Sequence, residues 1–102
     1  MKEQTVLITG ASRGIGFEIA KFLKDLGYRV IGTSTNLVGV QLIDQTLASR
    51  GMGLEMQIDN DESVAEAFSK IGELEELPCI LINNAGITAD NLIMRMSTKE
   101  WS

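Results

Sequence analysis

A cluster of glycines directly after an apolar run is the part of this sequence best suited to bind a charged ligand. The run Val6-Leu7-Ile8 is followed by Thr9-Gly10-Ala11-Ser12-Arg13-Gly14-Ile15-Gly16. When a strand is followed by a tight turn and then a helix, backbone N–H groups and the positive end of the helix dipole point to one place. The spacing G-x-x-x-G-x-G therefore predicts a cradle for a nucleotide phosphate. A glycine-rich turn with a purely structural role is the alternative.

A second polar motif follows another apolar run. Asn83-Asn84-Ala85-Gly86 comes directly after Cys79-Ile80-Leu81-Ile82. Asparagine side chains bond the backbone in tight turns, so part of this motif's role is structural. Taken together, the two motifs resemble those of the short-chain dehydrogenase/reductase family, T-G-x-x-x-G-x-G and N-N-A-G, in the same order and at about the same spacing. The segments 31–35 and 83–96 resemble more narrowly the 3-oxoacyl-[acyl-carrier-protein] reductases of that family. This resemblance runs to Trp101 but covers only the first part of the family's pattern.

The elements that must position these motifs alternate between strand and helix. Strands are predicted over 5–9, 28–34, about 54–58 and 79–82, and Gly51 and Gly53 are expected in the turn before the third strand. Helices are predicted between them, the first with Ile15, Ile19, Phe22, Leu23 and Leu26 as its apolar positions. This pattern predicts an α/β fold with a Rossmann-type parallel sheet. The resemblance implies strand order 3-2-1-4 with flanking helices, truncated after the fourth strand. Ligands bind beyond the carboxyl ends of such strands, where both motifs lie.

The end of the second predicted strand favours one dinucleotide. Sites for NAD usually place an acidic residue there, on the ribose 2′-hydroxyl, but Thr33-Ser34-Thr35-Asn36 contains none. Arg13 can reach a 2′-phosphate with a charged planar fork, and the hydroxyls of Ser34 and Thr35 can donate to it. In the reductases that the chain resembles, the Arg13 and Thr35 positions serve NADP. We therefore predict NADPH as cofactor; the alternative is that Arg13 is simply a solvated turn residue.

The resemblance also implies contacts with the rest of the cofactor. Ile58 and Asp59 are expected beside the adenine, although Gln57 stands where the family usually has Asp or Asn, and Asp59 could instead cap the next helix. Asn83, Ala85 and Gly86 are expected to line the ribose or support the sheet. The expected cofactor-binding set is Gly10, Ser12, Arg13, Gly14, Ile15, Gly16, Ser34, Thr35, Ile58, Asp59, Asn83, Ala85 and Gly86.

Composition excludes several other classes of function. The net charge is −5 with no histidine, so there is no basic stripe for nucleic acid and no metal site is expected. The single cysteine, Cys79, is expected to be a buried and inert thiol. No apolar run is long enough to span a membrane, and the first residues lack a signal-peptide pattern. A cytoplasmic location is expected.

Hydride transfer in this family uses a tyrosine, a lysine, a serine and an asparagine that follow the N-N-A-G motif by some distance. The only tyrosine here is Tyr28, and no lysine lies four residues on. No catalytic residue is therefore assigned. Residues 1–102 are expected to be the N-terminal portion of one NADP-binding domain, with the catalytic portion absent. The exposed edge of the fourth strand would make this portion marginally stable and prone to associate.

Three functions remain open from the sequence. The first, which we favour, is the cofactor-binding part of an NADPH-dependent 3-oxoacyl-[acyl-carrier-protein] reductase of fatty-acid synthesis. The resemblance implies a carrier-linked 3-oxoacyl thioester as substrate and a homo-oligomer, in most cases a tetramer, as the assembly. The second is a short-chain reductase of another ketone. The third is a nucleotide-binding module without catalysis.

Overall fold

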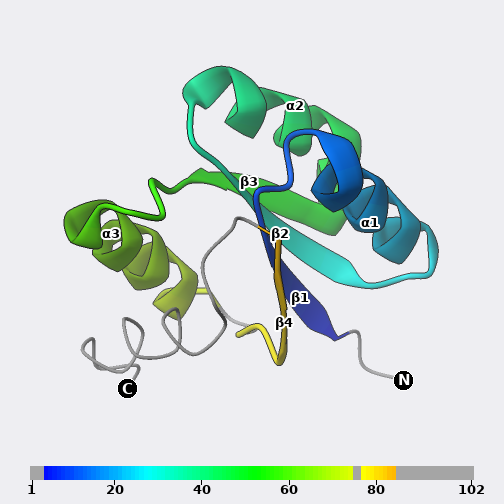
Figure 1. Ribbon diagram of the computed structural model, residues 1–102. Helices are drawn as coiled ribbons and strands as arrows, with labels where there is room; N and C mark the ends of the chain where they lie inside the picture. Colours follow the sequence, from blue (N-terminus) through cyan, green and yellow to red (C-terminus); the bar gives the residue numbers. More distant parts are fainter. Residues whose placement is uncertain (1–3, 75–76, 85–102) are drawn as a thin grey trace.

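The computed structural model describes residues 4–74 and 77–84, which build a four-stranded parallel sheet (Figure 1). Its strands are β1 (Thr5–Thr9), β2 (Arg29–Ser34), β3 (Gly51–Glu55) and β4 (Ile80–Asn83). They lie in the order β3-β2-β1-β4, so that β1 pairs with both β2 and β4. This arrangement confirms the predicted α/β class and strand order.

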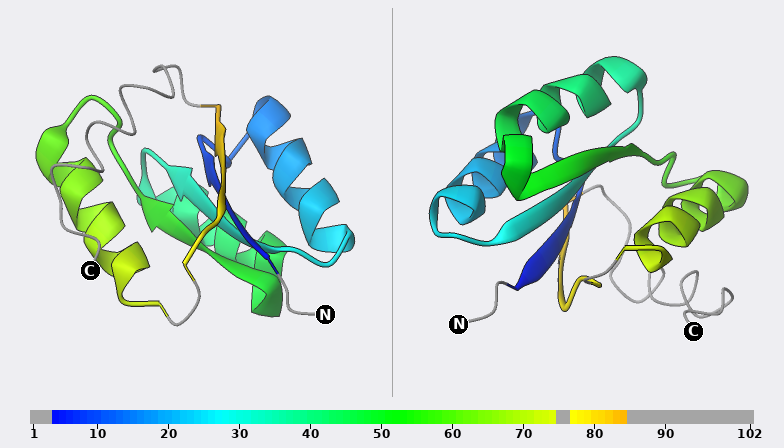
Figure 2. Two further views of the ribbon diagram at one scale, coloured as in Figure 1. Left: turned by 90° about the horizontal axis from the view of Figure 1, so that it is seen from below. Right: turned by 180° about the vertical axis from the view of Figure 1, so that it is seen from behind.

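Helices cover both faces of the sheet. The helices α1 (Gly14–Asp25) and α2 (Leu37–Leu47) pack on one face, and α3 (Asp61–Gly72) packs on the other (Figure 2). The short 3₁₀ helix η1 (Ala48–Arg50) joins α2 to β3. Right-handed crossovers produce this division, because the chain moves outward from β1 to β3 and then returns past β1 to β4. Within 4–74 and 77–84, no helix is long and apolar enough to cross a membrane.

The sheet separates two apolar cores, and β1 contributes to both. Val6 and Ile8 belong to the cluster under α1 and α2, whereas Leu7 belongs to the cluster under α3. Successive side chains of a strand point to opposite faces, so an unbroken apolar run is what a strand covered on both sides needs. All five residues of β1 are buried, which fixes the strand that carries the glycine turn.

The third strand lies earlier in the chain than predicted. It spans Gly51–Glu55 instead of about 54–58, and its two glycines are inside the strand. A Cβ at Gly51 would lie 1.9 Å from the Val30 carbonyl oxygen, and one at Gly53 would lie 2.7 Å from that of Val40. The glycines therefore serve close packing rather than a turn.

Side-chain burial differs from what the sequence pattern indicates at α1 and at Cys79. Of the apolar positions predicted for α1, Ile15, Phe22 and Leu26 are exposed, and the fully buried residues of the helix are Gly16 and Ala20. Small residues face the sheet because α1 packs closely against it. Cys79 is exposed, not buried, because it precedes β4, which pairs within the described part of the chain only with β1.

Candidate functional site

The glycine turn lies at the carboxyl edge of the sheet, between the end of β1 and the start of α1. Gly10 and Gly14 adopt φ values of +66° and +64°, a backbone conformation that favours glycine. The turn is tied to the neighbouring strand by two hydrogen bonds. The Gly10 N–H donates to Thr33 Oγ1 (3.1 Å) and the Ala11 N–H to the Thr33 carbonyl (2.8 Å). The sequence therefore shapes this turn through glycine, and β2 holds it in place.

Gly16 lets the first turn of α1 approach the strand it follows. A Cβ at this position would lie 2.3 Å from the Gly10 carbonyl oxygen and 2.5 Å from Asn84 Nδ2. By contrast, a Cβ at Gly14 would meet no atom within 4 Å. The turn is therefore closed on its protein side at Gly16 and open to its surroundings at Gly14, as a cradle for a bound group requires.

Among the three α-helices of the described residues, α1 is the one whose start has neither a side-chain cap nor a carboxylate in its first turn. Its N-cap residue, Arg13, makes no capping hydrogen bond. In α2, Asn36 Oδ1 accepts from the Gly39 N–H (2.8 Å), and in α3, Asn60 Oδ1 accepts from the Ser63 N–H (3.1 Å). The first N–H groups of a helix have no partner within it. Those of α1 point, with the positive end of its dipole, at the open side of the glycine turn.

The end of β2 lies against the glycine turn. The buried Ser34 hydroxyl donates to Ser12 Oγ (3.2 Å), and the Asn36 N–H donates to Ser34 Oγ (3.4 Å). A Cβ at Gly39 of α2 would lie 2.0 Å from Ser34 Oγ, so a glycine there leaves room for the serine pair. The exposed residues Arg13 and Thr35 follow these two serines directly. A guanidinium and a threonine hydroxyl are thus placed on adjacent segments with no acidic side chain between them.

The end of β4 closes the other side of the turn. Thr9 Oγ1 donates to Asn83 Oδ1 (3.0 Å) and accepts from the Asn84 N–H (3.0 Å). Asn84 Nδ2 donates to the Gly10 carbonyl (3.0 Å). The two asparagines therefore join β4 to the glycine turn, which is the structural part of the role predicted for this motif.

The segment after β3 completes the edge. Met56 N–H donates to the Ser34 carbonyl (2.8 Å), and the side-chain amide of Gln57 donates to the Thr35 carbonyl. Ile58 is half-buried against the core under α3, and Asp59 is exposed. Asn60, not Asp59, provides the side-chain cap of α3.

The structure thus brings most of the predicted site residues to one edge of the sheet. Ala85 and Gly86 lie outside the described residues. The hydroxyl of Thr33 and the small size of Gly39 were not predicted to matter for the site. Their signals in the sequence are a threonine within an apolar strand and a glycine within an apolar helix.

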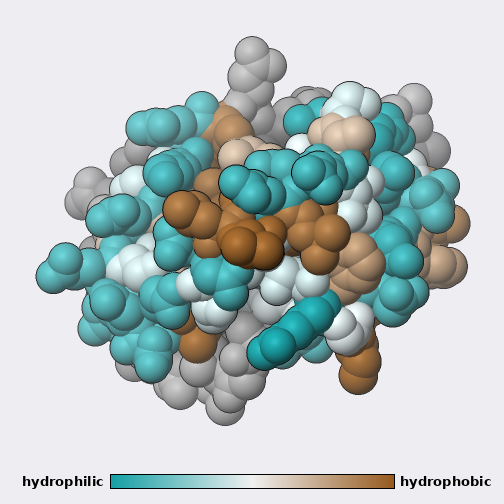
Figure 3. Space-filling view, turned by 90° about the horizontal axis from the view of Figure 1, so that it is seen from above, coloured by the Kyte–Doolittle hydropathy of each residue, from teal (hydrophilic) through white to brown (hydrophobic). Residues whose placement is uncertain are grey.

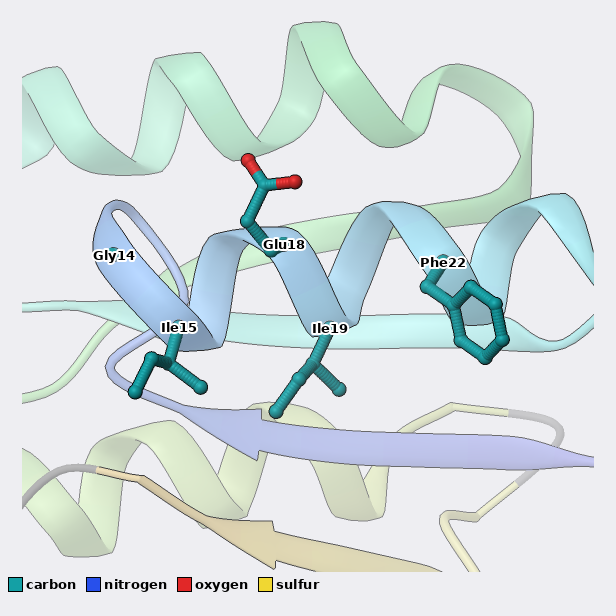
Figure 4. A pocket seen from close by; sticks show the side chains of 5 residues that line it. All are labelled: Gly14, Ile15, Glu18, Ile19 and Phe22. Atoms are coloured by element: carbon teal, nitrogen blue, oxygen red, sulfur yellow. The ribbon is translucent and has the colours of Figure 1, made fainter.

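A hollow runs from the start of α1 along the flank of this helix. It is lined by Gly14, Ile15, Glu18, Ile19 and Phe22 (Figure 4). Ile15 and Ile19 project together on one side of the helix, and Glu18 projects on the other. This hollow is open and mostly apolar, and through Gly14 and Ile15 it adjoins the glycine turn. Across the part of the chain that the structure describes, no group of acidic, histidine or cysteine side chains could hold a metal ion.

A parallel sheet with a glycine turn at its switch point is typical of nucleotide-binding proteins, and comparison with known families defines the class. The family model described as short chain dehydrogenase matches residues 4–102. The chain belongs to this family, which confirms the resemblance drawn from the two motifs.

Three of its relatives carry the same enzyme name. The chain is 44% identical over 101 residues to the 3-oxoacyl-[acyl-carrier-protein] reductase FabG of Buchnera aphidicola subsp. Schizaphis graminum, covering 99% of this chain and 41% of the relative. It is 45% identical over 104 residues to the enzyme of the same name from Pseudomonas aeruginosa, with 99% and 42% covered. It is 47% identical over 97 residues to that of Escherichia coli K12, with 94% and 39% covered. The chain therefore spans about two fifths of these relatives' length.

Proposed function

We propose that this chain is the cofactor-binding part of an NADPH-dependent 3-oxoacyl-[acyl-carrier-protein] reductase. The observation that carries the proposal is the uncapped start of α1, joined by hydrogen bonds to the ends of β2 and β4. An oxidoreductase of the short-chain family needs a dinucleotide at this edge. The starts of the other two α-helices, α2 and α3, are closed by asparagine side chains.

The pyrophosphate of the dinucleotide fits the glycine turn. The open space at Gly14 admits an anion, and the first N–H groups of α1, at Gly14, Ile15 and Gly16, donate to it. Ser12 lies beside them and is held by Ser34. The bound nicotinamide would supply a hydride, and the part of this chain is to bind and orient the cofactor's phosphates and ribose.

Arg13 and Thr35 give the preference for NADPH. Arg13 can pair with a 2′-phosphate through two parallel hydrogen bonds, and Thr35 adds a hydroxyl donor. No residue from Thr33 to Asn36 is acidic, so this segment itself places no negative charge against the phosphate. Ser34 contributes by joining the glycine turn to β2. Ile58 and Asp59 are assigned to the adenine side, and Asn83, Ala85 and Gly86 to the ribose side.

Turnover by this chain alone is not expected. Tyr28, the one tyrosine in the sequence, packs against the core under α1 and α2. It comes directly before β2, whose other end lies beside the glycine turn. The printed names of the relatives suggest a 3-oxoacyl group on acyl-carrier protein as substrate. We propose the same substrate, a homo-oligomeric assembly such as a tetramer, and a cytoplasmic location for the whole enzyme.

Titration of NADPH and NADH, followed by nicotinamide fluorescence, tests the proposal. We expect NADPH to bind at least about tenfold more tightly, which corresponds to one charge-assisted hydrogen bond. Arg13→Ala should remove most of this preference and leave NADH affinity within about twofold. Lys24→Ala, at the far end of α1, is the matched control for loss of a positive charge. Equal affinity for the two cofactors, or an unchanged ratio in Arg13→Ala, would contradict the assignment.

A further inference from the structure

Gln57 occupies the position where the ends of β2 and β3 meet the start of α3. The hydrogen bond from the Met56 N–H to the Ser34 carbonyl (2.8 Å) extends the pairing of β2 and β3 beyond the last strand residues. Gln57, two residues beyond the end of β3, therefore lies beside the segment that carries Thr35. It is half-buried, whereas Thr35 is exposed.

The backbone of Gln57 is fixed on the α3 side. Its N–H donates to Ser63 Oγ in the first turn of α3 (2.8 Å), and its carbonyl accepts from the Asn60 N–H (2.9 Å). Asn60 in turn caps the same helix. The main chain at Gln57 thus has partners on both sides, so its side chain extends from a rigid base.

The side chain of Gln57 extends away from α3, toward the segment after β2. Its amide Nε2 donates to the Thr35 carbonyl. This contact complements the Ser12–Ser34 hydrogen bond on the opposite flank of the same segment. Residues 34 and 35 are therefore held from two sides, by the glycine turn through Ser34 and by the β3–α3 connection through Thr35.

We propose that Gln57 is a positioning residue for cofactor choice, which holds the Thr35 segment where it meets the 2′-phosphate of NADPH. This inference rests on the proposed NADPH site. Three properties of the side chain suit the task. A carboxamide donates to a carbonyl, carries no charge that would repel a phosphate, and is longer than asparagine by one carbon–carbon bond of about 1.5 Å. Asparagine has a shorter reach toward Thr35, and a glutamate carboxylate would repel both the carbonyl and the phosphate.

The test compares NADPH and NADH binding in Gln57→Met, Gln57→Glu and the unaltered chain. Gln57→Met keeps the length and removes the donor, and we expect it to weaken NADPH about fivefold to tenfold, with NADH within about twofold. Gln57→Glu adds a negative charge and should weaken NADPH further. Gln45→Met, the same change at an exposed position of α2, is the control and should alter neither affinity.

The outcomes separate the inference from the proposed function. An unaltered chain without preference for NADPH would overturn both. If the unaltered chain prefers NADPH and Gln57→Met retains that preference, the inference alone is overturned. Equal weakening of both cofactors would also overturn it, because a purely structural role would affect both. Amide hydrogen exchange at Asn36, measured without cofactor, should become faster in Gln57→Met, and unchanged exchange would contradict the positioning role.

Discussion

The starts of α1 and α3 lie on the same edge of the sheet but are built in opposite ways. At α3, nearby side chains satisfy the N-terminus of the helix. Asn60 accepts from the Ser63 N–H, and Asp61 and Glu62 place negative charge in the first turn. At α1, Arg13 makes no capping bond and the first turn has no acidic residue. Both helix ends carry partial positive charge, but only α3 neutralises it with its own side chains.

This difference shows that a helix N-terminus can be left open by the absence of a capping side chain as well as by the presence of glycines. At α1 the glycines provide room, and the missing cap leaves N–H groups for an external anion. At α3 the asparagine and the carboxylates close the same kind of end. Among the α-helices of the described residues, only α1 thus has an open start, and the glycine turn that leads into it is joined to the ends of β2 and β4.

The largest expected effect comes from filling the close approach at Gly16. In Gly16→Ala the new methyl group would lie 2.3 Å from the Gly10 carbonyl oxygen, so the turn must shift. We expect a loss of about 1–3 kcal/mol in the free energy of unfolding and at least about a hundredfold loss in NADPH affinity. Urea unfolding and fluorescence titration measure the two.

Gly72→Ala is the control for this change. Gly72 ends α3, and a Cβ there would meet no atom within 4 Å. Alanine should therefore leave NADPH affinity unchanged and raise stability by no more than about 1 kcal/mol. Similar losses in both variants would show that glycine content, rather than the α1 approach, explains the result.

Giving α1 a side-chain cap, as α3 has, should abolish the difference in capping between the two helices. In Arg13→Asp the carboxylate can accept from the first N–H groups of α1 and interact favourably with its dipole. We expect about 0.5–1 kcal/mol of added stability, together with at least about a hundredfold weaker NADPH binding, because the new side chain takes the anion's place. Thermal unfolding without and with NADPH reports both quantities. A variant that still binds NADPH tightly would show that the anion is held elsewhere.

Removing the cap of α3 should have the complementary result. Asn60→Ala loses the bond to the Ser63 N–H, and we expect about 1 kcal/mol of lost stability with NADPH and NADH affinities within about twofold of the unaltered chain. Denaturant unfolding and cofactor titration provide the measurement. Ser69→Ala, at an exposed position later in α3, is the control. If Asn60→Ala weakened binding as much as Arg13→Asp, the two helix starts would not have separate roles.

The smallest effect is expected on the flank of α1, away from its start. Apolar side chains gather on the face that α1 and α2 present (Figure 3). The exposed large apolar residues of these two helices and of the C-cap of α1 are Ile15, Phe22, Leu26, Leu37, Val38 and Leu42. Phe22→Gln should change stability by less than about 0.5 kcal/mol. It should also reduce association between chains, measured by sedimentation, because contiguous exposed apolar surface promotes contact. Unchanged association would show that this face does not contribute to it.

The first strand and the glycine turn after it could be predicted from the sequence because they depend on strong local signals, whereas the strand order came from the family resemblance. The apolar run of β1 and the positive-φ glycines each act through neighbouring residues. Burial along α1 could not be predicted in the same way. Its apolar positions have helical spacing, but only small residues fit where the helix approaches the sheet, so Gly16 and Ala20 are buried and Phe22 is not.

The hydrogen bonds between separate segments of the candidate site could not be predicted from the sequence, for a related reason. Ser12 and Ser34 are 22 residues apart, and Gln57 and Thr35 are also 22 residues apart. Their partnership depends on the register of β2 with its neighbours. The register of β3 was itself displaced from the prediction, because Gly51 and Gly53 suit close packing as well as turns.

The most direct test of the open helix start follows backbone amide resonances of isotope-labelled chain during titration with NADPH. The account predicts that the amides of Gly14, Ile15 and Gly16 shift most and saturate together, that those of Ser12 and Thr35 follow, and that Ser63 in the first turn of α3 does not respond. NADH should shift the glycine-turn amides only at higher concentration and leave Thr35 nearly unchanged. Saturable shifts at the start of α3, or none at the glycine turn, would contradict the account.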